Sequence, residues 1–242
     1  MNTHILLLYV SIVLELLGVL FLALFSCLKL HGKFRVFIIG LFVFLLVDAV
    51  DYIAKQISLS TGAFDSNAFG VQMIVFAIQA IILAFCAYFS VKVFVNFSYR
   101  YKDFFTIGAG AAAFKLLDGA KEHFSYLQLL LGNYTVTEGG MTAEQYQQNA
   151  DALLQIPVVD FGIALFEVLL TSFIIILAAY LASSALAREE DSMIYIPIGA
   201  GVYLVYSAAY WALFRYVSIW LGLAVGLAAA VGSIFVLRSE RE

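Results

Sequence analysis

Seven long apolar segments follow one another along this chain, separated by short polar stretches. A helix rises about 1.5 Å per residue, so about 20 predominantly apolar residues are enough to cross a hydrocarbon core about 30 Å thick. Neither proline interrupts the middle of a segment, which favours continuous helices. We therefore predict an all-α, polytopic transmembrane helix bundle of about seven spans, forming one domain over residues 1–242. The segments are 5–28, 35–54, 71–96, 104–128, 157–185, 193–214 and 217–237.

Basic residues are concentrated on one side of this arrangement. They follow the odd-numbered segments and comprise Lys29, Lys33, Arg35, Arg100, Lys102, Arg188, Arg238 and Arg241. Only Lys55, Lys121 and Arg215 fall on the other side. Because positive residues accumulate on the cytoplasmic side, the pattern predicts an N-terminus outside and a C-terminus inside. The polar loop at about 130–156 is then extracytoplasmic, and a short surface helix is expected to begin after Thr142.

Composition supports the same class of protein. Hydrophobic residues make up 64% of the chain and charged residues 12%, which excludes a soluble domain. The net charge of −4 gives no indication of nucleic-acid binding. We expect an integral protein of a prokaryotic cytoplasmic membrane, in contact with lipids and with a membrane-protein partner or further copies of itself.

Charged residues within the predicted spans are the candidate site. An ionisable group at bilayer depth is costly unless it is paired or hydrated, so each one is a functional hypothesis. Glu15, Lys115 and Glu167 are expected near the midplane, with the others closer to the outer surface. The full set is Glu15, Asp48, Asp51, Lys115, Asp118, Glu122 and Glu167.

Their spacing is compatible with two interpretations. Asp48 and Asp51 share one helix face, as do Lys115, Asp118 and Glu122. These residues form either a hydrated ligand site or proton path, or a structural network in which Lys115 pairs with Glu167 or Asp118.

Other residues in the spans predict packing. Gly108, Gly110 and residues 111–113 are small, and small residues let spanning helices approach closely. Tyr203 and Tyr206 lie too deep for an interfacial aromatic belt, so we expect them to form hydrogen bonds inside the bundle.

Catalytic motifs are missing from the sequence. It contains no HExxH motif or phosphate-binding loop, and none of its three histidines is expected at mid-membrane depth. We therefore expect no metal, no cofactor and no catalytic residues, and the sequence favours a protein that is not an enzyme.

Three features at the centre of the chain resemble a known family. They are a moderately polar third span, a basic turn at Tyr99–Asp103, and a fourth span opening Ile107-Gly108-Ala109-Gly110-Ala111. This order resembles YhfC-type membrane proteins, which are related to the CAAX-protease and PrsW group of glutamic intramembrane peptidases. The resemblance covers about residues 35 to 215, mostly through span order.

The resemblance implies a degenerate relative without peptidase activity. Active members are expected to carry Glu, Glu and Arg in the third span and His and Glu in the fourth. Those places correspond here to Leu83, Ala84, Ala87, Ala111 and Lys115. Only Lys115 could take part in acid–base chemistry, and it has the opposite charge. Glu167 is the one position that matches an acidic residue expected in the fifth span.

Three functions follow from these observations. The first is a non-catalytic scaffold or accessory subunit with a buried charged network, resembling an inactive intramembrane peptidase. The second is a small transporter or channel component that uses a polar path of carboxylates and Lys115. The third is an active glutamic-type intramembrane protease.

Overall fold

Helices account for nearly all of the structure. The computed structural model describes residues 3–62, 65, 68–95, 100–132, 143–187 and 192–239, and no strand occurs within these ranges. The all-α prediction is therefore confirmed for this part of the chain. The long helices are α1 (Thr3–Leu24), α2 (Phe34–Thr61), α3 (Phe69–Phe94), α4 (Tyr101–Leu131), α6 (Val158–Ser184), α7 (Tyr195–Tyr216) and α8 (Ile219–Ser239). The shorter elements are the π-helix η1 (Phe25–Lys29), α5 (Ala143–Gln155), and the 3₁₀ turns η2 (Ala185–Ala187) and η3 (Ser192–Ile194).

Six of these helices are long and apolar enough to cross a membrane: α1, α2, α3, α6, α7 and α8. Their outward faces carry large apolar side chains such as Phe21 on α1 and Phe235 on α8, which are 62% and 68% exposed. Exposing such an apolar surface to water is unfavourable, whereas contact with lipid tails is favourable. The chain is an integral membrane protein on these grounds. The predicted fourth span corresponds to α4, which is not among the six because charged residues occupy its second half.

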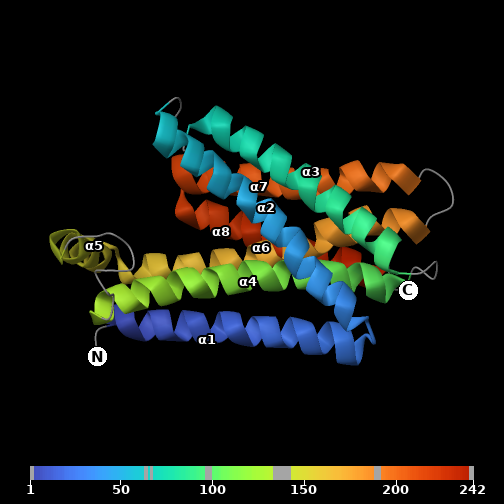
Figure 1. Cartoon of the computed structure of the whole chain (residues 1–242), viewed down its shortest axis with the longest axis horizontal. Coiled ribbons are helices and arrows are strands. Elements are labelled where there is room, and N and C mark those ends of the chain that lie inside the picture. The colour runs from blue at the N-terminus through green and yellow to red at the C-terminus, as the bar shows by residue number, and fades with distance from the viewer. Residues whose placement is uncertain are drawn as a thin grey trace.

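The central helix of the bundle is α4, which packs against α1, α2 and α6 (Figure 1). Its N-terminal half is mostly buried and contains a run of small residues at 108–113. A Cβ atom added at Gly110 would collide with the carbonyl oxygen of Phe37 on α2, and one at Gly108 would lie 2.8 Å from the carbonyl oxygen of Ile176 on α6. These glycines therefore allow backbones to touch, which confirms the predicted role of the small residues in packing.

The long helices join alternately at two ends of the molecule. The N-terminus, α5, the end of α2 and the start of α3 lie at one end in Figure 1. The C-terminus, η1, the end of α3 and the start of α4 lie at the other end. Lys33, Arg35, Arg100 and Lys102 therefore gather at the C-terminal end of the bundle, whereas Lys55 and Arg215 lie at the N-terminal end.

A short helix closes part of the N-terminal end, as the sequence predicted. Leu153 of α5 packs with Leu8, Leu127 and Phe161, which belong to three different long helices. The His4 ring also donates a hydrogen bond from Nε2 to the carbonyl oxygen of Ile156, at 2.9 Å. Thr142, expected to precede this helix, lies outside the described residues.

The glycine contact between α2 and α4 makes a testable prediction. We expect Gly110→Ala to lower the free energy of unfolding by about 1–3 kcal/mol, because the new methyl group must displace the backbone at Phe37. Gly201→Ala on α7 is the matched control, since a Cβ there meets no heavy atom within 4 Å. Thermal unfolding of both variants in detergent is the measurement. Equal losses at the two positions would contradict a backbone contact at Gly110.

Candidate functional site

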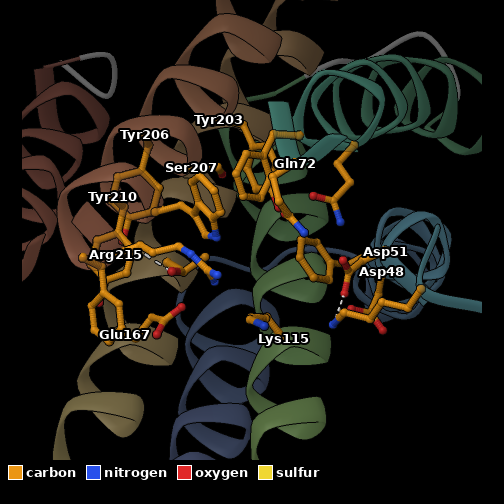
Figure 2. A pocket seen from close by; sticks show the side chains of 17 residues that line it. Asp48, Asp51, Gln72, Lys115, Glu167, Tyr203, Tyr206, Ser207, Tyr210 and Arg215 are labelled. Carbon is orange, nitrogen blue, oxygen red and sulfur yellow. Dashed lines mark hydrogen bonds and ion pairs between the residues drawn. The ribbon is translucent and has the colours of Figure 1, made fainter. Parts of the chain in front are cut away.

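A cavity of about 510 Å³ lies between α2, α3, α4, α6 and α7 (Figure 2). We call it the polar pocket. Its volume is large enough for a molecule of amino-acid size and falls within the range typical of small-molecule sites. Its charged lining residues are Asp48, Asp51, Lys55, Lys115, Glu167 and Arg215, and its neutral polar lining residues include Gln72, Gln79, Thr171 and Ser207.

Helical periodicity explains why these residues share one cavity. On α2, the lining residues Asp48, Asp51 and Lys55 recur at intervals of three and four, which keeps them on one face. On α3, Gln72 and Gln79 are seven residues apart and therefore also share a face. The two glutamines were not among the residues predicted for the site. Their spacing within an otherwise apolar segment was the signal that could have identified them.

Most charges of the polar pocket have no ion-pair partner, although the Arg215 guanidinium lies over the Trp211 ring. Lys55 Nζ lies 2.5 Å from Asp51 Oδ2, and this ion pair is partly exposed. Asp48, Lys115, Glu167 and Arg215 form neither an ion pair nor a side-chain hydrogen bond within the described ranges. The ion pair predicted from Lys115 to Glu167 or Asp118 is therefore not formed.

The reason for the missing ion pair lies in the placement of the three residues. Lys115 and Glu167 approach the cavity from different helices, α4 and α6, and their side chains stand apart in Figure 2. Asp118 is on the same helix as Lys115 but does not line the cavity.

Aromatic side chains of α7 form one wall of the pocket. The rings of Tyr206, Tyr210 and Phe214 stack in series, with centroids 5.7 and 5.9 Å apart. Tyr206 Oη and Thr171 Oγ1 are 3.3 Å apart, so this deep tyrosine does bond inside the bundle, to α6. Tyr203 bonds to Ser207 on its own helix. The Tyr210 hydroxyl group is buried and has no hydrogen-bond partner.

Glu15 is not part of the pocket. Its side chain is fully buried between helices, and Nδ1 of His123 lies 3.0 Å from each carboxylate oxygen. Gly119 makes room for this pair, because a Cβ there would lie 2.7 Å from Glu15 Oε1.

The sequence did not predict this contact, because no histidine was expected at mid-membrane depth. Side chains on a helix lean toward its N-terminus, and α1 and α4 run in opposite directions. The side chains of Glu15 and His123 therefore lean toward each other, which closes the difference in depth between their backbones.

The remaining predicted residues have separate roles. Glu122 is exposed and accepts a hydrogen bond of 2.5 Å from the Tyr126 hydroxyl group. Asp118 is half-buried outside the pocket, near enough for its charge to act on Asp48. Of the predicted set, the structure thus brings Asp48, Asp51, Lys115 and Glu167 together in one cavity. No cluster of His, Cys, Asp or Glu suitable for a metal ion occurs among the described residues.

No protein-family model matches the chain, and searches of curated proteins and of solved structures give no match either. The resemblance to YhfC-type proteins therefore stays a prediction. The places where that family is expected to carry catalytic groups are buried apolar positions at Leu83, Ala84, Ala87 and Ala111.

The buried Glu15–His123 pair makes a second prediction. We expect His123→Leu to lower the free energy of unfolding by about 3–5 kcal/mol, because it leaves the Glu15 carboxylate buried without a partner. The double variant Glu15→Leu/His123→Leu should recover most of that loss, since both polar groups are removed. Unfolding of the single and double variants in mixed SDS micelles measures the coupling. Glu122→Gln, at an exposed position, serves as the control. If the loss of unfolding free energy in the double variant equals the sum of the losses in the two single variants, the two side chains do not interact.

Proposed function

We propose that this protein binds a small polar solute in the polar pocket, as a component of a membrane transporter or channel. One observation carries the proposal: four charged side chains face a cavity inside an apolar helix bundle without neutralising one another. Unpaired charges at such a place are costly unless water or a ligand solvates them. A pocket with convergent polar groups is also the default location of a ligand site.

We further infer that α4 is the seventh span. It packs between α1, α2 and α6, so neighbouring helices cover most of its surface. Seven spans would put the two termini on opposite sides, and the gathered basic residues support a cytoplasmic location for the C-terminal end of the bundle. Lys55 and Arg215, the exposed charged residues of the lining, then face the extracytoplasmic side of a prokaryotic cytoplasmic membrane.

This arrangement favours transport over a scaffold. The pocket is accessible from the end that carries Lys55, while backbone contacts at Gly108 and Gly110 close the opposite half of the bundle. Access from one side is what the loading step of a transport cycle requires. A scaffold accounts for the Glu15–His123 pair but gives no reason for an open charged cavity. Proteolysis has less support, because this carboxylate–imidazole pair is enclosed by packed side chains outside the pocket.

Access to the pocket can be tested with cysteines at adjacent positions on α6. Thr171 lines the pocket, whereas Ser172 is buried and bonded to the Val168 carbonyl oxygen. In a background with Cys27 and Cys86 replaced by serine, a charged thiol reagent applied outside intact cells should modify Thr171→Cys and not Ser172→Cys. Modification of Thr171→Cys only in inverted membrane vesicles would reverse the orientation. Equal protection of both cysteines on both sides would contradict a water-filled pocket.

Solute binding can be tested without knowing the solute. A library of small anions, cations, zwitterions and sugars is screened for compounds that raise the thermal unfolding midpoint of the purified protein. A true ligand should stabilise the unmodified protein but not Lys115→Met, because that variant lacks the cation of the pocket floor. If no compound of any class has this effect, the proposed function is wrong.

A further inference from the structure

We propose that the solute is a zwitterion, a small molecule that carries an ammonium group and an acidic group. This inference rests on the proposed function and specifies its ligand. The polar pocket offers unpaired charges of both signs in equal number, two carboxylates and two cations. Such a set is complementary to a ligand that also carries both signs.

The charge balance excludes ligands of a single sign. Asp48 and Glu167 offset Lys115 and Arg215, and the Asp51–Lys55 ion pair is neutral as well. A ligand with one net charge would leave that charge uncompensated among apolar helices, where the dielectric constant is low. A zwitterion satisfies both signs and leaves the pocket neutral.

The positions of the charges suggest how the ligand lies. Figure 2 shows Lys115 at the floor of the pocket, with Arg215 toward α7 and Asp48 and Asp51 on α2 across from it. The acidic group would contact Lys115 and Arg215. The ammonium group would contact Asp48, a carboxylate of the lining that forms no ion pair.

The rest of the lining fits a compact molecule with an apolar portion. The cavity of about 510 Å³ holds a molecule of amino-acid size together with several waters, each needing about 30 Å³. Phe76 and Trp211 offer apolar surface, and the Arg215 guanidinium lies over the Trp211 ring, 5.6 Å from its centroid. The buried Tyr210 hydroxyl group beside them has no partner within the described residues and remains available as a donor.

Trp211 allows the binding to be measured directly. The chain has two tryptophans, Trp211 and Trp220, so Trp220→Phe leaves a single tryptophan, which lies in the pocket wall and can be excited selectively. The full-length protein in lipid nanodiscs is titrated with two zwitterions, leucine and 5-aminopentanoate. Each is compared with the compounds that lack one of its charges: 4-methylpentanoate and isoamylammonium for leucine, pentanoate and pentylammonium for 5-aminopentanoate.

We expect at least one zwitterion to bind about tenfold or more tightly than both of its singly charged counterparts, because each lost charge removes at least one charged contact. A singly charged compound that binds as tightly, or no response to either zwitterion, would overturn the inference. The proposed function survives that result if a compound that is not a zwitterion stabilises the unmodified protein but not Lys115→Met. If none does, both proposals fail together.

Charge variants distinguish binding at the polar pocket from non-specific binding. Lys115→Met should shift the preference toward the matched monocation, and Asp48→Asn should shift it toward the matched monoanion. Glu122→Gln removes a carboxylate outside the pocket and should leave the preference unchanged. Size-exclusion profiles verify that each variant is folded. Identical preferences in the unmodified protein and both pocket variants would contradict the proposed contacts.

Discussion

The structure depends on a place where the backbones of α2 and α4 touch. Gly40 and Gly110 face each other there, and neither position has room for a side chain. Helices this close at one point and inclined to each other must separate along their length. The distance between α2 and α4 increases toward the N-terminal end of the bundle. The polar pocket lies in the space between the two helices there, with Asp48 on one side and Lys115 on the other. Tight packing in one half of the molecule and a cavity in the other are therefore two results of one contact.

Charged groups within the bundle are of two physical kinds. Glu15 and His123 are enclosed by packed side chains and satisfy each other, so they contribute to holding α1 against α4. Lys115 and Glu167 are held apart on opposite sides of a cavity and interact only at a distance. Removing a group of the first kind leaves a buried charge without a partner. Removing one of the second kind changes the potential of the cavity while leaving its walls in place.

The sequence was sufficient to predict the helices because long apolar segments leave the backbone few alternatives. The main errors were at segment ends: α2 continues to Thr61 rather than to residue 54, since the Asp51–Lys55 ion pair supports an additional polar turn. Pairing between helices could not be predicted. It depends on the rotation of each helix about its axis, which brought His123 to Glu15 and separated Lys115 from Glu167. Arg215 was missed for the same reason, whereas the seven-residue spacing of Gln72 and Gln79 in an apolar segment could have identified these two residues.

The polar character of α4 has a consequence for how the protein is made. A segment with Lys115, Asp118, Lys121 and Glu122 in its second half partitions poorly into lipid by itself. Its partners α1 and α2 are synthesised earlier, but α6 is synthesised later. If α4 is the seventh span, as we propose, its membrane insertion relies on helices already in the bilayer until α6 arrives to cover its remaining face. The helix at the centre of the finished bundle is thus the one whose integration depends most on the order of synthesis.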